Sequence, residues 1–254
     1  MGTGAITGYI DVAQIALYVF WGFFAALIYY LHQEDKREGY PLESDRSDRI
    51  VVQGWPPIPK PKSFLLRDGR VVMAPNTKVS AQAINAAPVA PHLGAALAPI
   101  GDPMLAAVGP GSYADRSDLV DLTLDDLPRI VPLRSVSEFD VASEDPDPRG
   151  LPVVGADGVV GGTVRDLWID RSDAMFRYLE VEVPGAERRV LLPINFTRVS
   201  NRQVSVVSIL GQQFAQVPLT RDPDLSTLLE EDKIMAYYGG GTLYATPQRQ
   251  EPLL

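Results

Sequence analysis

The most apolar stretch of the chain runs from Val12 to Leu31, VAQIALYVFWGFFAALIYYL. It contains no ionised side chain, and Gln14 is its one polar interruption apart from tyrosine and tryptophan. Twenty residues of α-helix, at about 1.5 Å per residue, span roughly 30 Å, which is the thickness of the hydrocarbon core of a bilayer. The pattern therefore predicts a transmembrane helix over residues 12–31.

A cleaved signal peptide is the alternative interpretation of this run. It is disfavoured because residues 1–11 hold no Lys or Arg, the run is longer than a typical signal core, and no small-residue cleavage site follows it. Six basic residues lie between Lys36 and Lys62, and none precedes the helix. The positive-inside rule then predicts that residues 1–11 lie outside and that the rest of the chain lies in the cytoplasm.

A period of two, typical of strands, begins near Leu151. Short alternating runs are separated by the turn signals Asp157-Gly158, Pro184-Gly185 and Ser200-Asn201. The runs are Val159 to Val164, Asp166 to Asp170, Met175 to Val183, Arg189 to Pro193 and Gln203 to Ile209. Four or five strands at this spacing predict a small antiparallel sheet or barrel.

The run from Met175 to Val183 predicts a half-buried strand, because apolar and acidic residues alternate from Leu179 onward. The same alternation places Arg177 on the apolar face. A guanidinium there needs partners, and Asp170 and Asp173 are the nearest carboxylates before it in the sequence. Most Arg–Asp pairs of this kind are structural, so this parity alone favours a structural role over a functional one.

Two further segments complete the expected organisation. The segment Ser226 to Tyr238, STLLEEDKIMAYY, has helical spacing, and Gly239-Gly240-Gly241 would end the helix. Between Trp55 and Pro110 lie ten of the 22 prolines. Proline removes a backbone donor and biases its predecessor away from helix, so we expect an extended segment that does not fold on itself. A free linker is one interpretation; a segment that lies on a partner's surface suits its scattered apolar residues better.

The composition of the chain excludes several classes of function. The formal net charge of −9 argues against a nucleic-acid partner, since binding to phosphate depends on clustered basic residues. The absence of cysteine excludes disulfides, thiolate metal sites and thiol nucleophiles, and two histidines, His32 and His92, leave little for a catalytic triad. An anchored enzyme is therefore the weakest hypothesis. Acidic clusters such as Glu230-Glu231-Asp232 are more often solvated faces than acid–base sites.

Several segments carry a family resemblance. The run FWGFFAALIYYLHQEDKREGYPLE closely resembles the H subunit of the photosynthetic reaction centre of purple bacteria. Collinear resemblances follow in PKPKSFLL, GDPM, VGPGS, DPRGLPVVGADG, RYLEVEV, LLEEDKI and GGTLYA. The stretch from about Leu151 to Leu210 also resembles a PRC-barrel, a small β-barrel module. The implied architecture is one N-terminal transmembrane helix, a mainly β cytoplasmic domain and a short C-terminal helix.

The resemblance implies a structural, proton-conducting subunit that is not an enzyme. It would be anchored in the bacterial inner membrane, would bind no pigment itself and would cover the cytoplasmic face of the L and M subunits. Bacteriochlorophyll, bacteriopheophytin, quinones and non-haem iron would all be held by partner subunits. A light-harvesting antenna, a cytochrome subunit and membrane lipids are further candidate neighbours. Reduction of the secondary quinone by two electrons needs two protons, which this subunit would conduct through carboxylates and water.

The resemblance also implies candidate residues for proton transfer. By family position, Asp170, Asp173 and Arg177 correspond to polar residues near the proton-entry route. The segment Asp121 to Leu127 aligns with a segment that carries paired histidines in some members. Here that segment has no histidine, so we expect a carboxylate entrance instead. The expected set of proton-transfer residues is Asp121, Asp125, Asp126, Asp170, Asp173, Arg177 and Glu231.

The sequence predicts six regions in order. They are a periplasmic terminus (1–11), the transmembrane helix (12–31), an extended proline-rich segment (32–110), a connecting segment packed on the barrel (111–150), the PRC-barrel core (151–225), and a helix with a tail (226–254). A membrane-tethered PRC-barrel adaptor of another assembly remains the alternative function. Such an adaptor would need the barrel but neither LIYYLHQEDKREGYPLE nor the proline-rich segment.

Overall fold

The computed structural model describes residues 4, 6, 10–44, 47–76, 85–92, 94–185 and 189–250. The chain divides into two compact units. One comprises residues 1–80 and 92–94; the other comprises residues 81–91 and 95–254. The expected tail after residue 250 and most of the segment before residue 10 lie outside the described residues.

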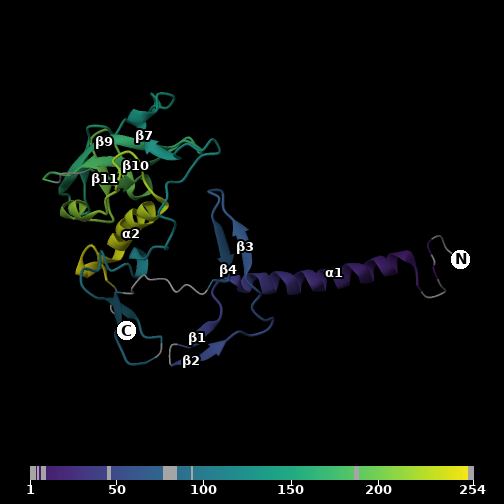
Figure 1. Ribbon diagram of the computed structural model, residues 1–254. Coiled ribbons are helices and arrows are strands. Elements are labelled where there is room, and N and C mark those ends of the chain that lie inside the picture. Colours follow the sequence, from purple (N-terminus) through teal and green to yellow (C-terminus); the bar gives the residue numbers. More distant parts are fainter. Residues whose placement is uncertain are drawn as a thin grey trace. The chain divides into compact units, whose positions relative to one another are not determined.

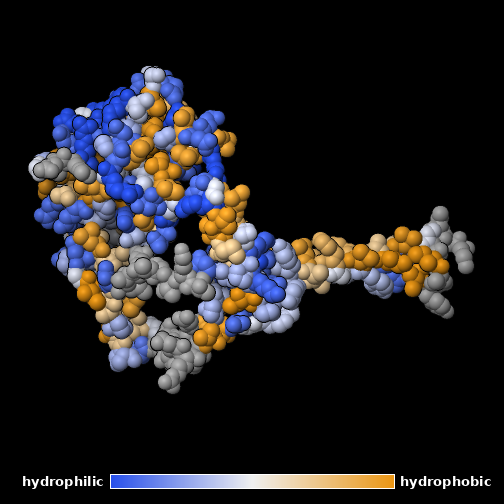
Figure 2. Space-filling view, in the orientation of Figure 1, coloured by the Kyte–Doolittle hydropathy of each residue, from blue (hydrophilic) through white to orange (hydrophobic). Residues whose placement is uncertain are grey.

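The first unit is dominated by the helix α1 (Val12–Glu34), shown in Figure 1. It begins at Asp11, whose carboxylate accepts a hydrogen bond from the backbone N–H of Gln14 at 2.7 Å. None of its residues is buried, and Figure 2 shows hydrophobic colour over most of its length. The helix is long and apolar enough to cross a membrane. It ends three residues later than predicted, where the first charged side chains appear, and a short 3₁₀ helix, η1 (Asp35–Arg37), follows.

The proline-rich segment is not simply extended, which corrects the sequence prediction. Three two-stranded hairpins form: β1 (Leu42–Ser44) with β2 (Ser47–Val52), β3 (Lys62–Leu65) with β4 (Val71–Ala74), and β5 (Ala86–Pro88) with β6 (Leu97–Pro99). The first two belong to the first unit and the third to the second unit. Proline is tolerated because every strand of a two-stranded hairpin is an edge strand, and the missing N–H can face away from the partner.

The core of the second unit is a curled, mainly antiparallel sheet (Figure 1). Its strands follow the order β11-β10-β9-β8-β13-β12, and β7 also pairs with β9. Their bounds are β7 (Ile130–Pro132), β8 (Pro152–Val154), β9 (Val160–Asp170), β10 (Met175–Glu182), β11 (Arg189–Pro193), β12 (Thr197–Val199) and β13 (Val204–Val206). The pairing of β8 with β13 is parallel. This is the predicted class of fold: a small β-barrel-like domain and, among the residues that the structure describes, one helix apolar enough to cross a membrane.

The sheet differs from the predicted strands, and β7, β8 and β12 lie outside every predicted run. The runs expected at Val159–Val164 and Asp166–Asp170 form one continuous strand, β9. In addition, β10 is buried on both faces over part of its length, since Glu180 is only 4% exposed. The second face is covered by the segment around Arg134, which donates to Glu180, and by the loop containing Asp224, which accepts from the same arginine. Alternation along the strand could not reveal this covering, because it comes from distant segments.

The C-terminal helix α2 (Leu228–Tyr244) continues through the three glycines that were expected to end it. It begins with a capping box, in which the side chains of Thr227 and Glu230 bond each other's backbone N–H. The glycines serve close packing: a Cβ on Gly239 would lie 2.8 Å from the Pro110 carbonyl oxygen, and one on Gly241 would lie 2.5 Å from the Ser208 carbonyl oxygen. The helix therefore contacts the backbone of its neighbours directly.

Short 3₁₀ helices connect the strands of the second unit. They are η2 (Gly109–Gly111), η3 (Leu133–Ser135), η4 (Ile194–Phe196), η5 (Gly211–Gln216) and η6 (Pro247–Arg249). The hydrophobic core lies between the curled sheet, η5 and α2. Its largest fully buried side chains include Trp168, Tyr238 and Phe214.

Candidate functional site

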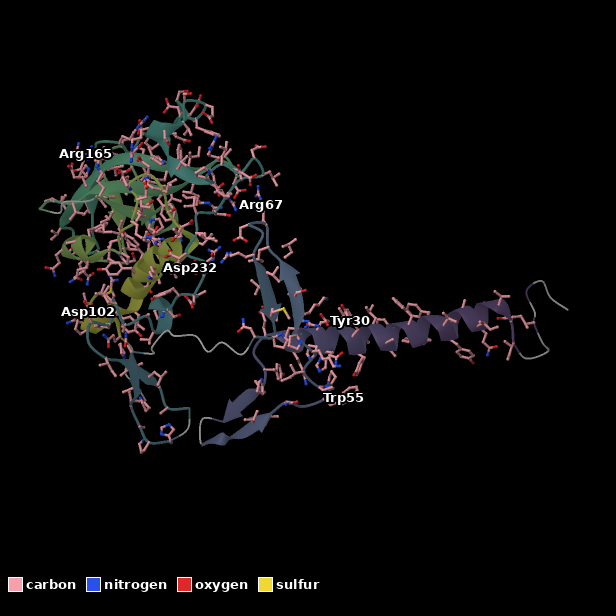
Figure 3. The ribbon with its side chains drawn as sticks, in the orientation of Figure 1. Tyr30, Trp55, Arg67, Asp102, Arg165 and Asp232 are labelled. Atoms are coloured by element: carbon pink, nitrogen blue, oxygen red, sulfur yellow. The ribbon has the colours of Figure 1, made fainter. Side chains whose placement is uncertain are left out.

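A cavity of about 540 Å³ opens where the end of β9, the start of β10 and the first turns of α2 meet. We call it the acidic cavity. Its ionisable lining consists of four carboxylates, three arginines and one tyrosine: Asp121, Asp170, Glu231, Asp232, Arg116, Arg129, Arg177 and Tyr178. Four of the seven residues predicted from the sequence, Asp121, Asp170, Arg177 and Glu231, are thus brought together. Asp232 is labelled in the side-chain view of Figure 3.

Asp170 is the most deeply placed carboxylate of the cavity. It ends β9, is fully buried, and accepts backbone hydrogen bonds from Ser172 and Asp173 at 3.0 and 3.2 Å. Burial by itself favours the neutral form, but hydrogen bonds from Arg129, from the Asp173 N–H and from Arg177 outweigh it and lower the pKa of Asp170. Asp170 is therefore a fixed negative charge at neutral pH and not a group that exchanges protons there.

Arg177 contacts both of the carboxylates predicted as its partners. Its Nη2 lies 3.1 Å from Asp170 Oδ2 and 2.8 Å from Asp173 Oδ2. The pairing of β10 with β9 shifts register between Phe176 and Tyr178. Such a bulge re-aims side chains, so Arg177 and its neighbour Tyr178 both line the cavity, although strict alternation would put them on opposite faces. Asp173 does not line the cavity but joins it through this contact.

Arg129 is the residue that the sequence pattern did not reveal. Its guanidinium lies 2.9 Å from Asp170, 2.8 Å from Asp173 and 3.4 Å from Asp121, so it connects three of the predicted carboxylates. These carboxylates raise the pKa of Arg129 further above its already high value. Arg129 reaches them because β7 begins at the next residue and pairs with the end of β9, Ile130 opposite Asp170. No local pattern signals that pairing.

Glu231 differs from Asp170 in its hydrogen-bond partner, which is a tyrosine and not an arginine. The Tyr178 hydroxyl donates to its Oε2 at 3.2 Å. Burial raises the pKa of Glu231 to about 7, and the Tyr178 hydrogen bond and the positive charges of Arg116 and Arg177 only partly oppose the shift. Burial and the charge of Glu231 also raise the pKa of Tyr178, so that hydroxyl keeps its proton. Glu231 is therefore poised to gain and lose a proton near neutral pH.

Asp125 and Asp126 do not reach the cavity. They lie in an exposed turn in which the Asp126 N–H donates to the Thr123 carbonyl oxygen at 3.2 Å. The Asp125 N–H donates to Thr123 Oγ1 at 3.3 Å, and Asp126 has a left-handed backbone, with φ of 60°. Of the expected entrance residues, Asp121 alone is among those lining the cavity. The role of all three in proton entry stays a prediction.

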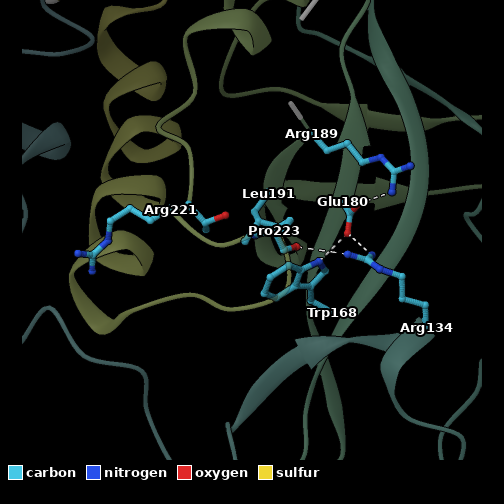
Figure 4. Close-up of a pocket in the computed structure, with 8 residues that line it drawn as sticks. Arg134, Trp168, Glu180, Arg189, Leu191, Arg221 and Pro223 are labelled. Atoms are coloured by element: carbon cyan, nitrogen blue, oxygen red, sulfur yellow. Dashed lines mark hydrogen bonds and ion pairs between the residues drawn. The ribbon is translucent and has the colours of Figure 1, made fainter. Parts of the chain in front are cut away.

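A second cavity, of about 370 Å³, lies further along β10 around Glu180 (Figure 4). Glu180 accepts hydrogen bonds from Arg134 at 2.5 Å, Arg189 at 2.6 Å and the Trp168 indole N–H at 3.0 Å. We call these four residues the Glu180 cluster. Burial opposes ionisation, but the bonds from Arg189, Arg134 and Trp168 outweigh it and lower the pKa of Glu180. Arg134 also binds Asp224 at 2.5 Å, so the cluster fixes the loop before α2 to the sheet.

Neither cavity resembles a metal centre. Within the described ranges, no group of three or more His, Asp or Glu side chains is arranged to hold a metal ion. The acidic cavity instead combines a fixed carboxylate, arginines that neutralise it and one carboxyl group that titrates near pH 7. Such an arrangement suits the transfer of protons, since a group that stores a proton must have a pKa near the working pH.

Comparison with known protein families gives two matches. Residues 4–135 match the model of the photosynthetic reaction centre H-chain N-terminal region, which is just over half of the chain. Residues 140–213 match the PRC-barrel domain. The first match contains α1, the hairpins and Arg129, and the second contains Asp170, Arg177 and Glu180. Together the two matches cover most of the chain, since the second begins at residue 140, shortly after the first ends at residue 135.

Proposed function

Because this chain belongs to the photosynthetic reaction-centre H-chain family, we propose that it caps the cytoplasmic face of the L and M subunits and passes protons toward the secondary quinone they hold. Membership in the family means that the chain associates with other reaction-centre subunits. The proposal adds the identity of these subunits, the capping role and the proton path. In this proposal the partner subunits bind the pigments, quinones and iron, and this chain catalyses no reaction of its own.

The titration of Glu231 carries the proposal. Two-electron reduction of a quinone takes up two protons, and a buried route for them needs at least one group that is partly protonated at the working pH. Glu231, with a pKa of about 7, meets this requirement. Asp170 is held ionised by Arg129 and Arg177, so it positions these arginines at the cavity and does not itself store a proton near neutral pH.

Asp173 fits the position of an intermediate acceptor. Its side chain is 45% exposed, yet its Oδ2 contacts the guanidinium groups of both Arg129 and Arg177 at 2.8 Å. It is therefore accessible to water while it remains attached to the cavity. The path that we propose runs from water at Asp173 and Asp121 to Glu231, with bound water completing the steps between these side chains.

The decisive experiment compares Glu231→Gln with Glu144→Gln in the intact complex. Both changes remove one carboxylate, but Glu144 is exposed and lies outside both cavities. We expect Glu231→Gln to slow transfer of the second electron to the quinone by about tenfold, because that step waits on a proton. The first electron transfer should keep its rate. Flash-induced absorbance changes between about pH 6 and 9 measure both steps.

Equal second-electron rates in the two variants across this range would remove Glu231 from the path. If the first electron transfer slowed as well, the substitution would have disturbed the quinone site and not proton delivery. The alternative function, an adaptor of another assembly, is tested by purification of the native complex. Its bacteriochlorophyll absorption bands must accompany this chain if the proposal is correct.

A further inference from the structure

The loop of residues 53–57 is attached to the end of α1 by a buried lysine. Lys36 is only 4% exposed, and its Nζ donates to the carbonyl oxygens of Gln53 and Pro56 at 2.7 and 2.6 Å. The same ammonium lies 5.0 Å from the centroid of the Tyr40 ring. An ammonium group taken out of water must find such partners, so the position of the loop is specified by Lys36.

The loop presents Trp55 beside the aromatic residues of the helix. The Trp55 ring lies 5.5 Å from that of Tyr29, centroid to centroid, and the residue is 75% exposed. Figure 3 shows Trp55 and Tyr30 at the same end of α1. Gly54, with φ of +63°, makes the turn that precedes the tryptophan. A large aromatic side chain is thus held out from the protein at the level where the apolar helix ends.

Lys36 and Arg37, the two cations that directly follow the helix, are occupied by contacts within the chain. Arg37 pairs with Glu34 at 2.7 Å and donates to the carbonyl oxygens of Lys60 and Ala74, both at 2.9 Å. Lys36 is bound as described above. These two residues are therefore not available as phosphate ligands. Three aromatic side chains do face outward here: Tyr29, Tyr30 and Trp55 are between 40% and 75% exposed.

We propose that the loop 53–57 is a second membrane-contacting element, in which Trp55 inserts into the headgroup region of the leaflet where α1 ends. Tryptophan and tyrosine favour this region because one part of each ring system is apolar and another part donates a hydrogen bond. The contact continues the lipid-facing surface of α1 at Tyr29 and Tyr30. It rests on α1 crossing the membrane and is independent of proton transfer.

Tryptophan fluorescence in lipid vesicles tests this inference with the full chain. The chain has three tryptophans, and Trp168 is 1% exposed, so quenchers reach it poorly. In a Trp21→Phe background, the difference between the parent and Trp55→Phe isolates the emission of Trp55. We expect lipids brominated near the glycerol end of their chains to quench it about twofold more than lipids brominated near the methyl end, because interfacial groups lie about 5–10 Å into the headgroup boundary.

Quenching of Trp55 by aqueous acrylamide but by neither brominated lipid would overturn the proposal. Protection from both kinds of quencher would also overturn it, since the ring would then be covered by protein, such as a second copy of the chain. These outcomes need no change at Lys36, so the test does not depend on that variant folding.

A pair of lysine variants tests how the loop is held. Lys36→Met should lose most of the lipid quenching because the loop is released, whereas Lys60→Met, a change at an exposed lysine, should keep it. Circular dichroism checks that α1 remains helical in both. Full lipid quenching in Lys36→Met would overturn the assignment of Lys36 as the residue that positions Trp55.

Discussion

The two cavities along β10 bury carboxylates in opposite ways. Glu180 accepts hydrogen bonds from two arginines and a tryptophan, whereas Glu231 accepts one from a neutral tyrosine. Accordingly, the pKa of Glu180 lies below its ordinary value, and that of Glu231 rises to about 7. Both are glutamates in the same domain, so the difference comes from their partners. Direct contact with arginine makes a buried carboxylate structural, and a neutral partner in its place allows the carboxylate to titrate.

The comparison predicts its largest effect at Glu180. Glu180→Gln leaves Arg134 and Arg189 without their shared charge, so we expect the free energy of unfolding to fall by about 3 kcal/mol. This loss of free energy is at the low end of the range for breaking a buried ion pair, because the two arginines are 39% and 48% exposed and remain partly solvated. Denaturant titration of the full chain in detergent measures the loss. Glu182→Gln, on the same strand but exposed, should cost less than about 1 kcal/mol; equal costs would contradict the structural role of the cluster.

Glu231 should make the free energy of unfolding fall as the pH rises. Its pKa is about 7 in the folded chain and near 4.5 when unfolded, so the folded chain binds more protons between these values. The stability contributed by the neutral group is complete below about pH 4.5 and is lost as the pH rises through about 7. Glu231→Gln cannot ionise, so it should avoid this loss, which amounts to at most about 3 kcal/mol. Unfolding free energies at about pH 5 and 8 measure it, and Glu144→Gln, matched in charge, should behave as the parent chain.

Variants of Asp173 and Arg177 distinguish a proton-carrying carboxylate from an arginine that only sets the charge around it. Asp173→Asn keeps the shape of the side chain but cannot carry a proton, so second-electron transfer in the intact complex should slow by several-fold, up to about tenfold. Arg177→Leu should act differently: loss of the positive charge raises the proton affinity of Asp170, whose pKa Arg177 helps to lower. Flash kinetics across pH distinguish the two variants. An unaltered second-electron rate in Asp173→Asn would leave Asp173 as a partner of the arginines and nothing more.

The smallest effect concerns the entrance. Asp121 lines the acidic cavity and contacts Arg129, whereas Asp125 and Asp126 lie in an exposed turn. We therefore expect Asp121→Asn to lower proton uptake by about twofold, and the double change at Asp125 and Asp126 to lower it less, through loss of surface potential alone. The effect of the double change should disappear at about 0.1 M salt, where surface charges are screened over roughly 10 Å. A larger effect for the double change would relocate the entrance to the exposed turn.

The sequence could predict the features that depend on local pattern. The apolar run predicts α1 to within three residues at its end, and the contact of Arg177 with Asp170 and Asp173 is confirmed. Both rest on information within a few residues, namely hydropathy and charge spacing. The proton-transfer roles of these residues stay predictions.

The sequence-based predictions fail where segments that are far apart in the sequence pack against each other. Arg129 joins the cavity through pairing of β7 with β9, some forty residues away, and Glu180 is buried by loops that come from other parts of the chain. The glycines of α2 predict a helix end by local propensity, but contact with Pro110 and Ser208 makes small residues necessary within the helix. Tertiary contact outweighs propensity in each case.

The three glycines also determine when α2 can form during folding. Each costs about 1 kcal/mol of helix stability relative to alanine, so the segment is a poor helix in an isolated chain. It gains its stability by docking on the backbone of η2 and of Ser208, which requires that the sheet already exist. Folding of the second unit should therefore proceed from the sheet to the helix. Because Glu231 lies in the first turns of α2, the cavity acquires its titrating group only in the last step of assembly.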